Sequence, residues 1–401
     1  MADAGMADAR NIDAVKLRAW WSHRQGLDGT LASSTAAEVL EATGWTRSVG
    51  GSAPYLTLFA RAGIRRESTD MALANLEIHE LPSARGCTYV LPQRDFVLGL
   101  KAAGRTPDPE LKIVRKFGVT EEELTRLCDA VREALVAGPL DPAELRAVVG
   151  SAARNFGPEG VKVGVATNMP VALGLLQVSG DIRRIPVNGR LDQQRYQYSL
   201  WDPNPLHSPK MSDDEAIVEQ ARAYFRWTGG AKVSEFQWFA GLNVKAAKVA
   251  TEPLHLEGLT GGYCVLPEDR AAFDAFQVPT EPQYVLVSSL DNIAHLRRDV
   301  SSLITKDDHA THFQSSRDFL TGMPHHAILD RGRLVGFWQF DPAEGRIVWL
   351  SFVAAEQGLE DAVARTQAFI REDLEDFRSV SLDSPKSRQP RIEALREGRA
   401  A

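Results

Sequence analysis

The chain has 401 residues, of which 44% are hydrophobic and 25% charged, a composition typical of a folded protein with several compact units. It contains no run of about 18 apolar residues and no secretory signal pattern, so we expect a cytoplasmic protein without a membrane partner. The net charge of -7 disfavours nucleic acid as a partner unless a basic surface is local. Cys87, Cys128 and Cys264 lie far apart without zinc-type spacing, and no nucleotide-binding motif occurs, so neither a metal nor a cofactor is expected.

Proline-rich, polar segments divide the chain into four predicted units. These segments lie at 105–110, 201–209 and 278–283, where proline and its polar neighbours favour turns. The first three units are expected to be helical with short hairpins, and the last to be rich in strands. The predicted units are 1–104, 105–203, 210–279 and 280–401.

A short helical pattern that ends in glycine occurs in each of the first three units. The segments STAAEVLEATG, DPAELRAVVG and VSEFQWFAG end at Gly44, Gly150 and Gly241, and each has a glutamate six positions before its glycine. The residues one and four positions after that glutamate are apolar or small and lie on one helical face. Glycine adopts the left-handed conformation that ends a helix at little cost. Each segment therefore predicts the first helix of a helix-turn-helix.

The third unit continues this pattern most clearly. Residues 242–254 predict a second helix with Lys245 and Lys248 on one side. Residues 254–269 predict two short strands around glycines. A helix-turn-helix followed by a small hairpin is the order of elements in a winged helix.

The other two units predict similar hairpins. In the first unit the segment ARGCTYVLPQRDF at 84–96 resembles the end of the third. In the second unit, residues 170–180 predict the second helix, and Asn188-Gly189 is typical of a tight hairpin turn. The sequence thus predicts three tandem winged helices, within 11–100, 118–200 and 213–270.

From residue 283 onward the pattern changes to β-type runs, followed by a helix at 359–377. This order predicts a small antiparallel sheet with a covering helix, so the predicted fold class is α+β. The last residues, 385–401, are basic and predict a loose tail. His309 and His312 have no second cluster of ligands, which indicates an exposed loop rather than a metal site.

Basic residues occur on the parts of a winged helix that face DNA in proteins of this architecture. Each residue alone is typical of a solvated surface, whereas the group predicts phosphate contacts with double-stranded DNA. The predicted DNA-binding residues are Arg183, Arg184 and Arg190 in the second unit, and Lys232, Lys245 and Lys248 in the third.

Five segments carry a resemblance to a known family. In chain order they are APYLTLFARAG at 53–63, ARGCTYVLPQRDF at 84–96, YFRWTGGAKVSEFQWFAGL at 224–242, VSSLDNIAHLRRD at 287–299 and HHAILDRGRLVGFW at 325–338. With them the chain resembles the YcaQ/AlkZ-type DNA glycosylases, which unhook crosslinks and remove bulky or alkylated bases. The resemblance covers nearly the whole chain and implies tandem winged helices that form a concave surface for DNA.

One stretch departs from the family pattern. Family members carry a Gln-x-Gln or Gln-x-Asp pair after the second helix of the first unit, and this pair acts on water and sugar during glycosidic cleavage. The matching positions here are Thr43 and Trp45, or Arg47 and Val49 in the other register. Neither register supplies a carboxylate or a carboxamide.

This departure changes the expected chemistry of the site. Thr43 retains a group that holds water, and Trp45 supplies a flat face for stacking on a displaced base. Arg47 is expected to hold a phosphate. The alternative for Trp45 is a place in the core of the first unit. Catalysis by other residues stays open, with Gln25, His79 and Glu80 as the candidates.

Two functions of different class follow from the sequence. The first is a DNA glycosylase variant that acts on a bulky or labile adduct. The second is a protein without catalytic activity that recognises damaged DNA, regulates transcription or sequesters a DNA-reactive compound. Double-stranded DNA, damaged or adducted, is the expected partner of either one.

Overall fold

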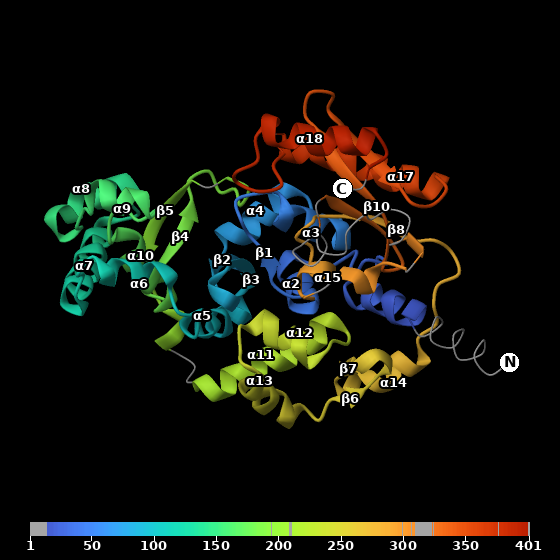
Figure 1. Ribbon diagram of the computed structural model, residues 1–401, viewed down its shortest axis with the longest axis horizontal. Helices are drawn as coiled ribbons and strands as arrows, with labels where there is room; N and C mark the ends of the chain where they lie inside the picture. Colours follow the sequence, from blue (N-terminus) through green and yellow to red (C-terminus); the bar gives the residue numbers. More distant parts are fainter. Residues whose placement is uncertain are drawn as a thin grey trace.

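The computed structural model describes residues 14–399 except 194, 208–210, 299, 306, 309–322, 324 and 376. The fold is α+β, with small antiparallel sheets surrounded by helices. His309 and His312 lie outside the described residues. Figure 1 shows the first 104 residues at the centre, the second predicted unit at one end, the third below and the last above.

The central part combines helices with a three-stranded sheet of order β1-β3-β2. A first helix covers residues 14–24. Thr35 and Glu38 form a capping box at the start of α2, which ends at Gly44 with φ 98° as predicted. The remaining elements are β1 (Thr46–Arg47), α3 (Ala53–Ala62), α4 (Arg66–Ala74), β2 (Ile78–Pro82), β3 (Thr88–Pro92) and α5 (Phe96–Gly104), after α2 (Ala36–Thr43).

The second part contains five helices and one hairpin. In chain order they are α6 (Pro109–Lys116), α7 (Glu121–Ala134), α8 (Pro142–Val149), α9 (Gly157–Lys162), α10 (Met169–Val178), β4 (Ile182–Pro186) and β5 (Tyr196–Leu200). Helix α8 ends at Gly150, which confirms that prediction. A turn does occur here, with the Gly189 amide donating to the Pro186 carbonyl at 3.1 Å, but the predicted two-residue hairpin at Asn188-Gly189 is wrong because the longer segment 187–195 joins the strands. Leu191 in this segment is fully buried in the core around α2 and α3.

The third part has the order of elements predicted for it. Its helices are α11 (Asp213–Thr228), α12 (Val233–Ala240) and α13 (Val244–Thr251), followed by the paired strands β6 (Glu257–Gly258) and β7 (Cys264–Val265) and by α14 (Pro267–Ala275). Gly241 ends α12 in the left-handed conformation, as predicted, and α13 begins after it. This is the order helix, turn, helix, hairpin.

The last part is a four-stranded antiparallel sheet of order β11-β10-β9-β8 with helices packed on it. The predicted loose tail is wrong, because residues 385–396 form a helix whose Ile392 and Leu395 are buried. These two apolar side chains lie among many basic ones, which hid the amphipathic pattern. The elements are β8 (Tyr284–Val287), α15 (Asn292–His295), β9 (His326–Asp330), β10 (Arg333–Asp341), β11 (Arg346–Ser351), α17 (Gln357–Phe369) and α18 (Pro385–Arg396).

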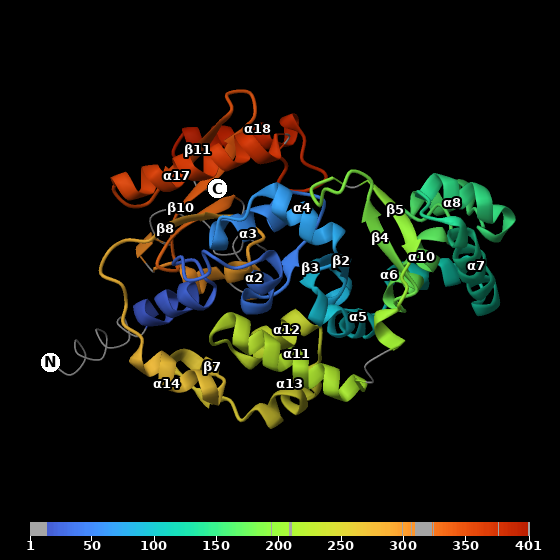
Figure 2. The ribbon, with the colours of Figure 1, turned by 180° about the vertical axis from the view of Figure 1, so that it is seen from behind.

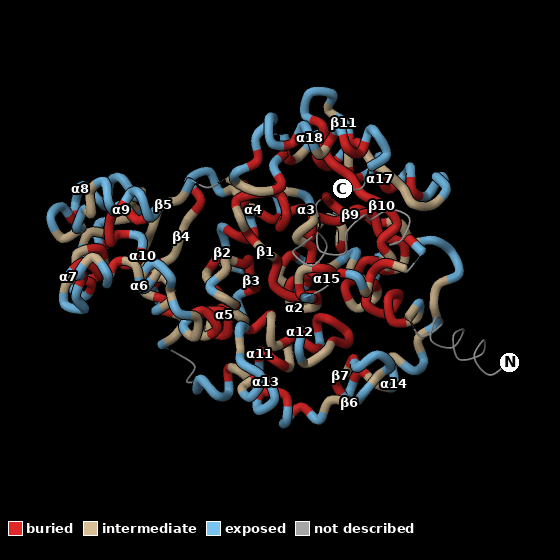
Figure 3. The backbone as a smooth tube through the Cα atoms, in the orientation of Figure 1, coloured by how far each residue is buried: buried red, intermediate tan, exposed pale blue. Residues whose placement is uncertain are grey.

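The hydrophobic cores join residues from different predicted units. One core packs α2 and α3 against the last sheet and α17, and another packs Trp45, β3 and α5 against α11, α12 and α13. The second part keeps its own cores between α6 and β5. Figure 3 accordingly shows buried backbone gathered at the centre and exposed backbone over α7 and α8. The central sheet thus has neighbours in every other part of the chain.

Candidate nucleic-acid interface

Trp45, the residue predicted to stack on a base, is fully buried. Its Nε1 donates a hydrogen bond to the Asp95 carboxylate at 2.8 Å, and its ring lies 5.1 Å from that of Trp227 in α11. Gly44 turns the chain so that Trp45 faces the third part of the molecule. The prediction of an open stacking face is therefore wrong, and the alternative of a core residue describes the structure.

The side chains of Thr43 and Gln25 also form hydrogen bonds inside the protein. The Thr43 hydroxyl donates to the Val39 carbonyl within α2, at 2.8 Å. The Gln25 side chain donates to the carbonyls of Thr43 and Trp227 and accepts from Arg61. All three polar groups of these side chains are satisfied inside the protein. Neither residue is placed to act on a ligand, so the catalytic assignment of Thr43 is also corrected.

We expect Trp45→Ala to lower the free energy of unfolding by about 3 to 5 kcal/mol, because it leaves a cavity in a close-packed core. The Asp95 carboxylate, whose pKa is raised chiefly by burial, also loses its hydrogen-bond donor. Trp45→Phe is the matched variant and should lose less, since most of the ring volume remains. Denaturant unfolding measures both values. A loss below about 1 kcal/mol for the alanine variant would contradict the core assignment.

Glu80 provides a buried carboxylate at the edge of the central sheet. It lies on β2, the edge strand nearest to the β4-β5 hairpin, and is 3% exposed. Its Oε1 accepts a hydrogen bond from the Ser48 hydroxyl at 2.5 Å and a longer one from the Tyr196 hydroxyl at 3.4 Å. Its Oε2 is buried without a hydrogen-bond partner among the described residues. An acceptor oxygen is therefore left over at this position.

Arg184 and Tyr196 close the site from the second part of the molecule, as the path of β4 and β5 beside the central sheet in Figure 2 indicates. The Nη2 atom of Arg184 lies 3.6 Å from Oε2 of Glu80, beyond hydrogen-bond distance. The guanidinium lies 4.7 Å from the centre of the Tyr196 ring. Burial and the charge of Glu80 raise the pKa of Tyr196, which keeps its hydroxyl a donor. Both side chains are partly exposed, so the carboxylate lies just beneath the surface.

A second group of side chains adjoins this site on the opposite face of the sheet. Arg47 donates from Nη1 to the Thr88 carbonyl at 3.0 Å, and its guanidinium lies 5.4 Å from the centre of the Tyr89 ring. The guanidinium of Arg85 lies 3.8 Å from the centre of the Trp238 ring. Among the described residues, no carboxylate forms an ion pair with Arg47 or Arg85. These two arginines therefore keep their positive charge available in an acidic protein.

His295 of α15 lies beside the two arginines as a neutral group. Burial, followed by the charges of Arg85 and Arg47, lowers its pKa to about 3. Its Nε2 is buried without a hydrogen-bond partner in the described part of the chain. His79, the other histidine considered from the sequence, is also buried, with both ring nitrogens unpaired and a pKa lowered to about 3 by burial first. It packs against Trp201 rather than facing the cluster.

Thr88 forms a hydrogen bond with one arginine of each group. Its hydroxyl accepts a hydrogen bond from Arg184 at 3.3 Å, and its carbonyl accepts from Arg47 and from the Ser48 backbone. Thr88 thus links the Glu80 site with Arg47, which belongs to the second group. We call the combined group the Thr88 cluster, and it consists of Arg47, Ser48, Glu80, Arg85, Thr88, Arg184 and Tyr196.

The remaining basic residues predicted from the sequence lie in different environments. Arg190 is held inside the molecule by Asp192 at 2.6 Å and by the Leu374 carbonyl, so its predicted DNA contact is corrected to an internal ion pair. Lys232 lies 4.8 Å from the Tyr263 ring centre at the start of α12. Arg183 on β4 is half-buried, and burial lowers its pKa.

Lys245 and Lys248 are exposed on α13, where they border a shallow hollow with Val244 and Val249. They are three residues apart and therefore lie on one side of the helix, as predicted. The structure thus brings Arg47 and Arg184 together and leaves the two lysines on a separate element. Ser48, Arg85, Tyr196 and Trp238 were missed, although Arg85 lies in a segment that the sequence had singled out.

Comparison with known proteins shows the family to which the chain belongs. The family described as "DNA glycosylase AlkZ-like" matches residues 39–369, which is most of the sequence. The chain belongs to the AlkZ-like DNA glycosylase family. The solved structure of Streptomyces sahachiroi DNA glycosylase AlkZ is similar, with a TM-score of 0.68, 19% identity, and coverage of 88% of this chain and 95% of that one. At this identity the likeness to AlkZ is one of fold.

Three negative findings complete the description of this AlkZ-like chain. No curated protein matches it significantly. In the described part of the chain, no helix is long and apolar enough to cross a membrane. Among the same residues, no group of three or more histidine, cysteine or acidic side chains is placed to hold a metal.

Proposed function

We propose that this AlkZ-like protein binds duplex DNA through the Thr88 cluster and removes a bulky or alkylated base by cleaving its N-glycosidic bond. The observation that carries the proposal is Glu80, a buried carboxylate with one oxygen held by Ser48 and the other without a hydrogen bond. Family membership supports the reaction class. The charge of Arg47 and Arg85 supports a polyanionic partner.

Glu80 has the chemistry that the missing glutamine pair would supply. Cleavage of a glycosidic bond develops positive charge on the sugar and needs a water molecule at the anomeric carbon. A carboxylate stabilises that charge and accepts a hydrogen bond from water. Oε2 is the atom assigned to this role, while Ser48 fixes the orientation of the group through Oε1. We therefore propose an altered active site in which Glu80 does this work.

The arginines are the proposed contacts with the phosphates of the DNA. Arg47 and Arg184 lie on either side of Thr88 and are assigned to phosphates that flank the target nucleotide. Trp238, which is partly exposed beneath Arg85, is assigned to a stacking contact. Competition binding with a duplex that carries one alkylated base tests this assignment. A preference of the wild type for that duplex over the unmodified one is expected, and equal affinities would contradict it.

Helix α13 is proposed as a second, sequence-tolerant contact with DNA. Replacing Lys245 and Lys248 by alanine should reduce the slope of log K against log salt by about 1.8, since each phosphate contact contributes about 0.9. Lys112 and Lys116, exposed on α6, form the matched control pair. Fluorescence anisotropy at several salt concentrations measures the slopes. An unchanged slope for the Lys245 and Lys248 variant would make α13 a structural helix only.

DNA binding without base release is the second candidate function. It is favoured by the 3% exposure of Glu80, because a nucleotide must displace Arg184 or Tyr196 to reach the carboxylate. In that case Glu80 only positions Arg184 and the hairpin. The two functions differ in whether abasic sites form after binding.

A further inference from the structure

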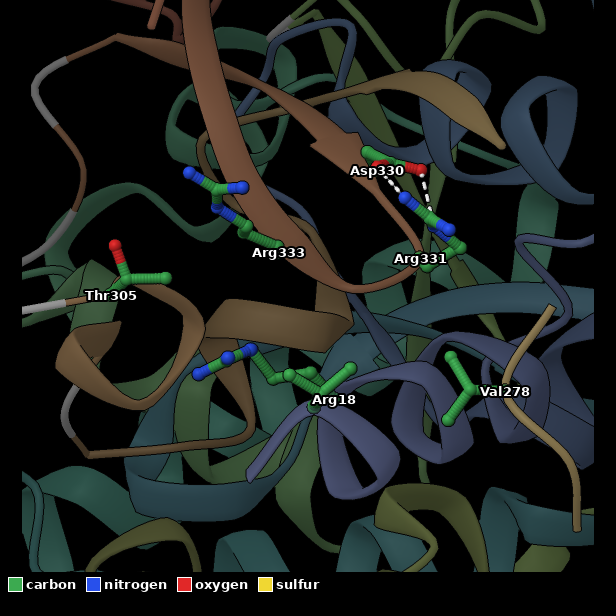
Figure 4. Close-up of a pocket in the computed structure, with 7 residues that line it drawn as sticks. Arg18, Val278, Thr305, Asp330, Arg331 and Arg333 are labelled. Carbon is green, nitrogen blue, oxygen red and sulfur yellow. Dashed lines mark hydrogen bonds and ion pairs between the residues drawn. The ribbon is translucent and has the colours of Figure 1, made fainter. Parts of the chain in front are cut away.

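A pocket of about 240 Å³ lies away from the Thr88 cluster, between the first helix and the last sheet. Its lining comes from residues 14–24, the β9-β10 turn and the segments before β8 and after α15. Val15, Arg18, Val278, Thr305, Asp330, Arg331 and Arg333 line it, and Figure 4 shows most of them. None of these residues takes part in the proposed DNA contacts.

Arg18 is the unusual residue of this pocket. It is only 7% exposed, and in the described part of the chain its guanidinium makes no hydrogen bond or ion pair. Burial lowers its pKa, and the nearby charge of Arg333 lowers it further, against the opposite effects of Asp308 and Tyr263. The side chain is buried, but its guanidinium nitrogens open into the pocket, where a positive charge without an ion-pair partner favours an anion.

The other charges in the pocket are already balanced. Arg331 is paired with Asp330 at 2.7 Å, and its Nη1 donates to the carbonyls of Pro279 and Thr280. Arg333 is paired with Asp308 at 2.8 Å. These pairs leave Arg18 as the uncompensated positive charge among the described lining residues.

Arg333 keeps one donor that its ion pair with Asp308 does not use. The hydrogen bonds from Arg333 to Asp308 come from Nε and Nη2, so its Nη1 makes none of them. Figure 4 shows the guanidinium groups of Arg18 and Arg333 on the same side of the pocket, toward Thr305, with Val278 on the other side. A β-carbon at Gly332 would meet the Arg18 carbonyl at 2.1 Å, so the first helix is packed tightly on the β9-β10 turn. Arg18 is therefore held in place by its backbone.

We propose that this pocket binds a small phosphate-bearing anion, with Arg18 as its principal ligand and Nη1 of Arg333 as a second donor. A guanidinium fork matches the oxygens of a phosphate, and two guanidinium groups favour a doubly charged anion over a singly charged one. Val15 and Val278 form the apolar side of the pocket, where the organic part of a phosphate monoester would lie. The anion would tie the first helix to the last sheet.

Inorganic phosphate is the probe, and thermal unfolding of the full chain is the readout. At constant ionic strength, about 20 mM phosphate should raise the melting temperature of the wild type by roughly 2 °C over chloride, because the anion binds only the folded state. Val15→Glu should abolish this rise, since a carboxylate three residues before Arg18 on the same helix face replaces the anion. Val15 is 42% exposed, so this change leaves the core intact.

Val15→Gln is the matched control and should keep the response to phosphate. Arg18→Met should remove the response to phosphate. If that variant does not fold, titration calorimetry of Val15→Glu with phosphate tests the same loss of binding. No rise in the wild type, or an equal rise in the Val15→Glu and Val15→Gln variants, would overturn the proposal. The wild type could also show no response to phosphate while Val15→Glu loses affinity for undamaged duplex. That result would overturn the small-anion proposal and assign the pocket to a backbone phosphate of DNA.

Discussion

Glu80→Gln should lower the single-turnover rate of base release from an alkylated duplex by about 100- to 1000-fold, while duplex affinity changes less than about twofold. The amide has nearly the same shape and still accepts the Ser48 hydrogen bond, so the site keeps its geometry. It lacks the negative charge that stabilises the cationic sugar and orients water. The rate is measured by converting abasic sites to strand breaks.

Two further variants make this result specific. Glu77→Gln changes an exposed glutamate three residues earlier and should leave the rate unchanged. Ser48→Ala removes the hydrogen bond that orients Glu80 and should slow release by about tenfold, because the carboxylate remains but is less well positioned. A Glu80→Gln protein as fast as the wild type would assign Glu80 to a structural role.

Replacing both Arg47 and Arg85 by methionine should weaken duplex binding by roughly 10- to 100-fold, because two unpaired charges facing phosphate are lost. Methionine retains much of the side-chain contact with the Tyr89 and Trp238 rings, so stability should change little. Anisotropy with an unmodified duplex measures the affinity.

Arg94→Met is the matched control for this double variant. Arg94 is an arginine paired with Glu41 at 3.0 Å on another part of the surface. Its removal should leave duplex affinity within about twofold of the wild type, since that charge is already compensated. Equal losses in the control and in the double variant would point to net charge rather than to the Thr88 cluster.

The sequence predicted those features that depend on local chemistry. The helix ends at Gly44, Gly150 and Gly241 are confirmed, because glycine adopts at little cost the positive φ that each helix end requires. The strands of the last sheet followed from their β-type runs. The α+β class is confirmed for the same reason, since it rests on the type and order of such elements.

The sequence failed where a residue's role depends on partners far along the chain. Trp45 packs against the ring of Trp227, which is 182 positions away in the sequence. No local sequence pattern indicates such a contact. Arg190 is held inside because its segment docks on the central core, where Nη2 also donates to the carbonyl of Leu374, 184 positions away.

The candidate site could be predicted only in part from the sequence. Glu80 was one of three open candidates, and Arg47 and Arg184 were expected to contact phosphate on separate grounds. Their convergence on Thr88 depends on how β4 and β5 lie beside the central sheet. That packing is set by long-range contacts, which the sequence does not display.

This AlkZ-like chain is proposed to release a base from damaged DNA. The most direct test is incubation of the wild type, at protein concentrations that saturate binding, with duplexes that carry one alkylated base or one crosslink. Alkaline cleavage then reports abasic sites. We predict strand breaks at the modified position that are lost in Glu80→Gln. Saturated binding of every such duplex without any abasic site would contradict the claim and leave DNA binding as the function.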